Sequence, residues 1–235
     1  MPSAPVNKLK KKEIEWLGGH YCTAHGHTYL EHYSCFLQEV AKGKQWNLGK
    51  EKLPIPQNIG FFDIENFGFK ADFGILLSYC IKDSESDNIL GRPITKKELD
   101  TCGDEKLVRD CVKDLKKFDR IVGFYSSKHD VPFVRSRAVF HKIPFPTVRS
   151  MLHTDVYYII KHKFKLSRNS QQTAYNILVG ESHKTHWGRD NWIKAIRGDK
   201  ESLTYIFEHN KIDVLELEEL FYAVDEFSLR TDRSI

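Results

Sequence analysis

The sequence predicts an α/β protein in which helices flank a mixed β-sheet and a small Cys/His-rich module precedes it. Three observations lead to this class. Apolar strand-like runs begin at residue 59, whereas helical patterns dominate from residue 95 onward. Cysteines and histidines cluster within residues 22–35, ahead of the first run. The composition, with 40% hydrophobic and 29% charged residues, is that of a globular protein and excludes collagen-like and disordered chains.

Length and charge set further bounds. A chain of 235 residues has room for one large domain together with a small module. The net charge of +4 is compatible with a nucleic-acid partner but does not require one. No run approaches about 18 uncharged apolar residues, so we expect no membrane span. The lysine-rich start lacks the apolar stretch of a signal peptide, and five cysteines are unlike a secreted disulfide scaffold, so we expect an intracellular, cytoplasmic protein.

Two regions of different composition divide the chain. Residues 1–57 comprise a basic lead that we expect to be poorly ordered (1–16), the Cys/His cluster, and a stretch rich in Lys, Gly and Pro (41–57). This last stretch indicates a linker or an extended arm. Residues 58–235 carry the strand and helix patterns and form the predicted main domain.

Three strands are predicted in the main domain. Residues 60–64 form an apolar run that ends in acidic residues. A second buried run, at 74–81, is expected to pair with the first as a hairpin through residues 66–72. Residues 120–125 form a short third strand of the core.

Helices are predicted from apolar spacing and from cap residues. Thr95 and Thr154 are each placed to cap a helix. Pro144 and Pro146 end a helix that begins near Pro132. The predicted helices span residues 95–117, 132–142, 154–161, 170–179 and 199–227.

Acidic residues recur at three places along the main domain. Asp63 and Glu65 are two residues apart, so their side chains share one face of the first strand. Asp130 follows the third strand and begins a helix, where it could also be a simple N-cap. His209 and Asp213 are four residues apart and share one face of the last helix, as a surface pair would. Each feature alone has an ordinary structural explanation, but their order along the chain forms one pattern.

In this pattern the sequence resembles the DEDD superfamily of 3′–5′ exonucleases, which have the ribonuclease H-like fold and include polymerase proofreading domains. The resemblance covers residues 59–228, and Thr154-Asp155-Val156-Tyr157-Tyr158, Lys165-Leu166 and Asn169 match the segment between the second and third motifs of stand-alone members. The three motifs are Phe62-Asp63-Ile64-Glu65, Gly123-Phe124-Tyr125-Ser126-Ser127-Lys128-His129-Asp130-Val131-Pro132-Phe133 and Glu208-His209-Asn210-Lys211-Ile212-Asp213-Val214.

The resemblance implies an enzyme that hydrolyses phosphodiester bonds at the 3′ ends of single-stranded or frayed nucleic acid, DNA favoured, and releases nucleoside monophosphates. Four carboxylates in one pocket need cations, and two Mg²⁺ or Mn²⁺ ions suit them. By resemblance, Asp63 bridges both ions, Glu65 and Asp213 bind the first, and Asp130 acts through the second. His209 is the expected general base or water-orienting group, although it stands at the spacing of the superfamily's tyrosine branch.

Further residues are expected to contact substrate. Asn66 and Phe67 follow the first motif, where such enzymes wedge the 3′ end, and Lys165 and Arg168 belong to a basic run beside the expected site. The implied partners are nucleic acid with a 3′ end and replication or repair proteins. Two alternatives stay open: a non-catalytic, zinc-dependent nucleic-acid-binding protein, and an endonuclease or RNA-processing nuclease of the same fold.

The Cys/His cluster predicts a separate metal site. Cys22 and His25 form one pair of ligands and His32 and Cys35 form another, with six residues between the pairs. Four nitrogen and sulfur ligands suit one tetrahedral Zn²⁺ ion with a structural or nucleic-acid-docking role. His27 could replace His25, and a histidine-rich surface loop with a buried cysteine is the alternative.

Overall fold

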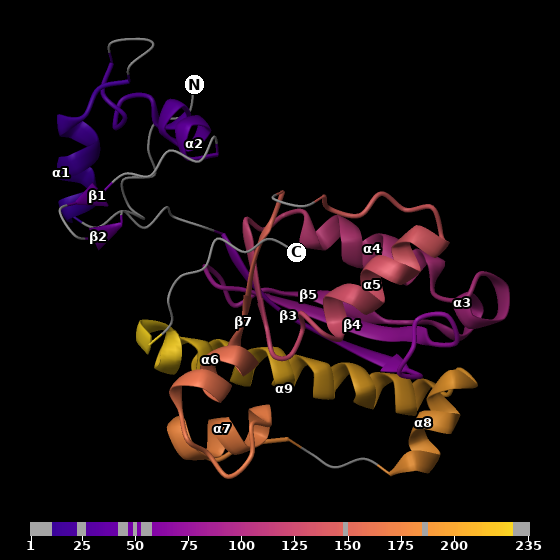
Figure 1. Cartoon of the computed structure of the whole chain (residues 1–235). Helices are drawn as coiled ribbons and strands as arrows, with labels where there is room; N and C mark the ends of the chain where they lie inside the picture. Colours follow the sequence, from indigo (N-terminus) through magenta and orange to yellow (C-terminus); the bar gives the residue numbers. More distant parts are fainter. Residues whose placement is uncertain are drawn as a thin grey trace. The chain divides into compact units, whose positions relative to one another are not determined.

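The computed structural model describes residues 11–22, 27–41, 47–48, 51–52, 58–147, 150–184 and 188–227. The chain divides into two compact units, Met1–Pro56 and Gln57–Ile235, and each is described by itself (Figure 1). None of the described helices combines the length and the apolar composition that a membrane span needs.

The larger unit is built on a five-stranded mixed sheet with the strand order β5-β4-β3-β6-β7 (Figure 1). The central strand β3 pairs antiparallel with β4 and parallel with β6, while β5 extends the antiparallel side and β7 the parallel side. The predicted strands are confirmed as β3, β4 and β6, and the structure adds β5 and β7. The strands are β3 (Ile59–Phe67), β4 (Ile75–Asp83), β5 (Ile89–Pro93), β6 (Arg120–Gly123) and β7 (Leu152–Asp155).

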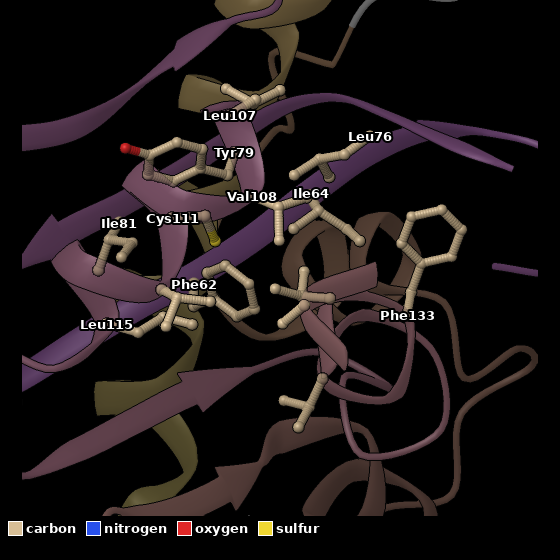
Figure 2. Close-up of a cluster of buried hydrophobic side chains, with 14 of the residues drawn as sticks. Phe62, Ile64, Leu76, Tyr79, Ile81, Leu107, Val108, Cys111, Leu115 and Phe133 are labelled. Carbon is tan, nitrogen blue, oxygen red and sulfur yellow. The ribbon is translucent and has the colours of Figure 1, made fainter. Parts of the chain in front are cut away.

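Alternation along β3 divides the larger unit into two hydrophobic cores. Phe62 and Ile64 point to one face of the sheet, where they pack with residues of α4 (Glu105–Leu115) and α5 (Asp130–Phe140) (Figure 2). Phe61 points to the other face and packs against α9 (Lys200–Val224). Helices therefore cover both faces, and the predicted α/β class with a mixed sheet flanked by helices is confirmed.

The predicted helix over 95–117 is two helices, α3 (Lys96–Thr101) and α4. Thr95 caps α3 as predicted, and Glu98 completes a capping box with it. Gly103 separates the helices because its φ of +61° is a left-handed conformation that an α-helix cannot continue through.

The later helices follow the predicted order, with one addition and one corrected cap. Thr154 lies in β7 rather than at a cap, and Asp155 is the N-cap whose side chain accepts the Tyr157 N–H. The added helix is α8, and α9 runs along the face of the sheet opposite α4 and α5 (Figure 1). These elements are α6 (Val156–Lys163), α7 (Gln171–Leu178), α8 (Arg189–Ile196), α9 and a final 3₁₀ turn, η2 (Asp225–Phe227).

The smaller unit contains two helices, α1 (Lys11–Gly19) and α2 (Tyr33–Ala41), and a short antiparallel pair, β1 (Asn47–Leu48) with β2 (Glu51–Lys52). The expected disorder of residues 1–16 is wrong for residues 11–16, which belong to α1, and residues 1–10 lie outside the described residues. An aromatic cluster forms the core of this unit, because Trp16 on α1 packs with Tyr29 and with Phe36 on α2.

Candidate active site

The first two acids of the site lie on β3. Asp63 and Glu65 alternate with the buried Phe62 and Ile64, so they share the face on which Phe61 packs against α9. The two carboxylates therefore face the helix that carries His209 and Asp213. A β-bulge follows directly, because the register of β3 against β4 shifts between Glu65 and Asn66.

Asp130 reaches the same place from helix α5, which follows the neighbouring strand β6. It is the first residue of α5, after the loop that follows β6, and only 4% of it is exposed. Its Oδ1 accepts the backbone N–H of Ile64 at 3.3 Å. The alternative of a simple N-cap is wrong, because His129 occupies the cap position and the Asp130 side chain binds across to β3.

Helix α9 brings three polar side chains to the same place. His209 Nε2 lies 3.8 Å from Glu65 Oε1 and 3.8 Å from Asp213 Oδ2. Between them, the fully buried Asn210 donates from Nδ2 to Asp63 Oδ2 at 2.5 Å and accepts the Ser78 hydroxyl at 3.2 Å. Asn210 thus fixes one oxygen of Asp63 and leaves the other to the pocket.

A cation that the sequence patterns did not identify also reaches the site. Lys184, on the segment after α7, places Nζ 2.8 Å from Asp213 Oδ1. Its side chain is 17% exposed, so this ion pair is shielded from bulk water. Lys184 lies in an irregular segment with no periodic pattern, and only the fold reveals its position.

These acids open onto a pocket of about 450 Å³. Asn66 lines it, as expected of a substrate contact, and aromatic residues, among them Phe69 and Trp192, also line it. Phe69 is 93% exposed, so its ring is accessible to a ligand in the pocket. The lining residues are Asp63, Ile64, Glu65, Asn66, Gly68, Phe69, Phe124, Tyr125, His129, Asp130, Trp192 and Asp213.

Three other predicted substrate contacts lie elsewhere. Phe67 is partly exposed but is not part of the pocket lining, because the bulge before it changes the direction of the side chains at the end of β3. Lys165 and Arg168 are exposed residues beyond the C-terminal end of α6, whereas the N-terminal end of α6 adjoins Tyr125. The eight residues of α6 separate the two ends by about 12 Å.

Burial and mutual repulsion perturb the carboxyl groups of the pocket. Burial raises the pKa of Asp63 well above its usual range, and the carboxylates of Asp130, Asp213 and Glu65 raise it further. The same causes, burial first, raise the pKa of Glu65 to about 8, and burial raises that of Asp130 to about 7. The ammonium of Lys184 acts in the opposite direction on Asp63 and Glu65. Such acids ionise together only when cations compensate them, so this donor set fits divalent metal ions.

The loop that leads to Asp130 is held by residues of β7. Asp155 accepts the backbone N–H groups of Tyr125 and Ser127 at 2.8 and 3.0 Å and the Ser127 hydroxyl at 2.5 Å. Tyr125 has a φ of +60°, a strained conformation for a residue with a side chain, and it lines the pocket. The buried Ser126 hydroxyl lies 2.8 Å from His153 Nε2, and burial lowers the pKa of His153 to about 4, so the ring is neutral.

The smaller unit gathers a second group of possible metal ligands. Cys22, His27 and Cys35 place one ligand atom each within 4.8 Å of one another. His32 Nδ1 lies 3.0 Å from His27 Nε2 and 3.3 Å from Cys35 Sγ, and His27 Nε2 lies 3.6 Å from that sulfur. His25, the expected ligand, lies outside the described residues. His27, the alternative to His25, lies in the ligand group. The cluster can hold a metal ion.

A sequence family model and a solved structure both support the fold. The sequence model of the RNase_H superfamily matches residues 60–224, which contain every acid of the pocket. The structure of the family B DNA polymerase from the hyperthermophilic archaeon Pyrobaculum calidifontis is similar, with a TM-score of 0.61 and 17% sequence identity over 74% of this chain. The match spans 25% of the polymerase chain, and at this identity the similarity is one of fold. No curated protein matches the chain. The mixed sheet, its helices and the matched sequence model together show that the chain belongs to the RNase_H superfamily.

Proposed function

We propose that this protein is a metal-dependent 3′–5′ exonuclease that acts on single-stranded or frayed nucleic acid and releases nucleoside monophosphates. One observation carries the proposal. Asp63, Glu65, Asp130 and Asp213 come from a strand and two helices that are distant in the sequence, and all four line one pocket. Burying four carboxyl groups together is costly, and a fold retains such a cost where the acids bind cations.

The proposed site holds two divalent ions, Mg²⁺ or Mn²⁺, between the four acids. The carboxylates of Asp130, Asp213 and Glu65 all raise the pKa of Asp63, so Asp63 lies within electrostatic reach of all three. It is therefore the proposed shared ligand, with Glu65 and Asp213 on one side and Asp130 on the other. Bound ions of this kind activate water and neutralise the charge that develops on a phosphodiester during hydrolysis.

The protein's own groups position the substrate and hold the acids. Asn210 fixes Asp63, and Asp155 holds the loop that leads to Asp130. The ammonium of Lys184 lies at Asp213, where it is placed to contact a phosphate group of the substrate. His209 Nε2 lies against Glu65 and Asp213, where it can bind a water molecule or a metal ion.

The aromatic side chains of the pocket favour a terminal nucleotide as the ligand. Phe69, Tyr125 and Trp192 line the pocket together with the acids, and the first two are exposed. Exposed aromatic rings stack on unpaired bases, with about 1–3 kcal/mol per base. The fold similarity to a DNA polymerase favours DNA as the substrate over RNA.

The test is trimming of oligonucleotides labelled at the 5′ end, in DNA and RNA forms, with Mg²⁺, Mn²⁺ or EDTA. We expect a ladder of products shortened from the 3′ end with either metal ion and none with EDTA. Asp63→Asn and Asp213→Asn should each lower the rate at least about a hundredfold, as loss of a main electrostatic contact does. The matched control is Asp100→Asn, which changes an exposed carboxylate on α3.

The alternatives give different results in the same assay. Cleavage of a circular single-stranded substrate would indicate an endonuclease, because a circle has no 3′ end. Binding that is equally tight in EDTA, without cleavage under Mn²⁺, would indicate a non-catalytic binding protein. Trimming by Asp63→Asn at the wild-type rate would contradict the proposed site.

We also propose that the Cys/His cluster of the smaller unit holds one structural Zn²⁺ through Cys22, His27, His32 and Cys35. Ligand atoms around a tetrahedral zinc are separated by roughly 3.3–3.8 Å, given its bond lengths to nitrogen and sulfur. The separations of 3.0, 3.3 and 3.6 Å between His27, His32 and Cys35 are near this range. Nδ1 of His27 also lies 3.1 Å from the Thr28 carbonyl, which would direct Nε2 toward a metal ion.

A further inference from the structure

The geometry around His209 differs from that of a hydrogen-bonded histidine. Nε2 lies 3.8 Å from one oxygen of Glu65 and 3.8 Å from one oxygen of Asp213. Both distances exceed the range of roughly 2.7–3.2 Å in which N–H groups donate to oxygen. The nitrogen is therefore equally far from two carboxylates and hydrogen-bonded to neither.

These separations agree with three ligands of one metal ion. With metal–ligand bonds of about 2.1 Å, ligand atoms on an octahedral ion are separated by roughly 3.0 Å when adjacent and 4.2 Å when opposite. The ligand atoms of Glu65, His209 and Asp213 all lie within 4.8 Å of one another. Each distance of 3.8 Å is shorter than the separation of two opposite ligands, so one ion can contact His209 Nε2 together with either carboxylate oxygen.

The two oxygens of Asp213 have separate neighbours. Lys184 lies at Oδ1, at 2.8 Å, while Oδ2 is the oxygen that faces His209. The ion pair with Lys184 thus leaves Oδ2 available to a metal ion. The ammonium also reduces the negative charge of the site, which weakens binding of a hard cation that depends on charge alone.

The other nitrogen of His209 does not distinguish a base from a metal ligand. Nδ1 is buried and has no hydrogen-bond partner among the residues that the structure describes. A hydrogen bond at the second nitrogen normally orients both catalytic bases and metal-bound histidines. The surroundings of Nε2 therefore carry the assignment.

We propose that His209 is a direct metal ligand through Nε2 and that, with Glu65 and Asp213, it forms a mixed nitrogen–oxygen site that prefers Mn²⁺ and similar transition-metal ions to Mg²⁺. This inference rests on the proposed function and deepens it, since it assigns the identity of one ion. Mg²⁺ takes oxygen ligands almost exclusively, whereas imidazole is a common ligand of transition metals. His209 then binds the ion and does not take a proton from the attacking water.

The experiment measures Mn²⁺ binding to the full chain rather than activity. Pulsed electron paramagnetic resonance of the Mn²⁺-loaded protein detects a directly bound nitrogen through its ¹⁴N coupling. The coupling should be present in the wild-type protein and absent in His209→Gln. His209→Gln should also weaken Mn²⁺ affinity by at least about tenfold, the loss that even outer-sphere partners of a metal produce, and Mg²⁺ affinity by less.

The matched control is His129→Gln, which removes another half-buried histidine at the same pocket. Nε2 of His129 lies 2.8 Å from Asn66 Oδ1, so this residue is engaged with the protein and not with the acids. The ¹⁴N coupling should survive in this variant. A circular dichroism melt of both variants checks that they are folded.

The outcomes separate this inference from the function on which it rests. If Mn²⁺ binds the pocket without ¹⁴N coupling and His209→Gln leaves the affinity unchanged, His209 is not a ligand and the exonuclease proposal still stands. If Asp63→Asn and Asp213→Asn bind Mn²⁺ as tightly as the wild-type protein, the pocket is not a metal site and both proposals fail.

Discussion

Single residues of the pocket differ in how the protein holds them. Asp63 is tied to Asn210, Asp130 to the backbone of Ile64, and Asp213 to Lys184, so each acid has a different restraint. Only the restraint on Asp213 carries a positive charge. The protein thus supplies a cation of its own at Asp213, and the proposed metal ions would compensate the other acids.

Removing the charge of Lys184 should change the Mn²⁺ requirement and the maximal rate in opposite senses, one improving and the other worsening. In Lys184→Met the pocket loses an ammonium group that competes with Mn²⁺ for the carboxylate of Asp213. At pH 8, half-maximal activity should therefore need less Mn²⁺. The maximal rate should fall by about ten- to a hundredfold if the ammonium contacts the phosphate. Metal titrations of the rate measure both quantities. Lys165→Met, an exposed lysine outside the pocket, is the control, and an equal loss there would contradict the assignment.

The raised pKa values of the carboxyls predict a pH-dependent stability. Glu65 and Asp130 have pKa values of about 8 and about 7, above the ordinary values near 4 of unfolded chains. The folded, metal-free protein therefore binds more protons than the unfolded one, and its free energy of unfolding falls as pH rises from about 4 to about 8. Melting in EDTA should show this fall. Mn²⁺ at a hundredfold excess over Kd should restore about 2.7 kcal/mol at pH 8.

Asp63→Asn provides the check on this pH effect. Without the Asp63 carboxylate, each remaining acid has one repelling neighbour fewer, and the fall in melting temperature between pH 5 and pH 8 should become smaller. A fall as steep as in the wild-type protein would mean that the destabilising groups lie outside the pocket.

Among the elements, the loop between β6 and α5 has a special position because it joins the sheet to Asp130. Close packing holds it as well as hydrogen bonds: a Cβ on Gly123 would come within 2.1 Å of the Ser126 hydroxyl. Asp155 makes the remaining restraints from β7. Small changes in this loop should therefore move Asp130 without unfolding the sheet.

Two aspartates at N-caps allow this idea to be tested. Asp155 caps α6 and also holds the loop, whereas Asp199 caps α9 through Ser202 and does not line the pocket. Asp199→Ala should cost about 1 kcal/mol of stability through loss of the cap. Asp155→Ala should cost more, because it also removes the hydrogen bonds to Tyr125 and Ser127. Only Asp155→Ala should also lower the rate of 3′ trimming, and chemical denaturation alongside rate assays measures both effects. Equal rates for the two variants would contradict the role of the loop.

The same elements show what the sequence could and could not predict. β3, β4 and β6 have continuous apolar runs and were predicted, whereas β5 contains Gly91 and Arg92 and β7 contains His153 and Thr154. Those short strands form because they pair with neighbours already in the sheet, and that pairing is not encoded in their own composition. The acids of the pocket could also be predicted from the sequence, because they occur in motifs that follow one another in a recognisable order. Lys184 could not, because it lies in a segment without a periodic pattern.

At the scale of the whole molecule, two units rest on different sources of stability. The larger unit has two hydrophobic cores, one on each face of its sheet. In the part of the smaller unit that the structure describes, the core is one aromatic cluster with the Cys/His group beside it. A unit of this size is marginal without a further constraint, and a metal ion is a common one.

Loss of the proposed zinc should therefore affect one unit only. Cys35→Ser should lower the zinc content from about one ion per chain to near zero, measured by elemental analysis. In thermal melting, the smaller unit should lose its transition while the transition of the larger unit keeps its midpoint. Full zinc content in this variant would show that the zinc is bound elsewhere. Cys102→Ser, in the larger unit, is the control.

The alternation of β3 has a consequence for how this protein can vary. Neighbouring residues of one strand serve two different layers: Phe62 and Ile64 fill a core, and Asp63 and Glu65 face the pocket. Deleting one residue ahead of Asp63 would exchange the two sets, turning carboxylates into the core and rings into the pocket. Point substitutions change one layer at a time, whereas a change in length damages both together. The length of this strand is therefore more constrained than the identity of its residues, and a library of single-residue deletions should tolerate none between residues 60 and 65.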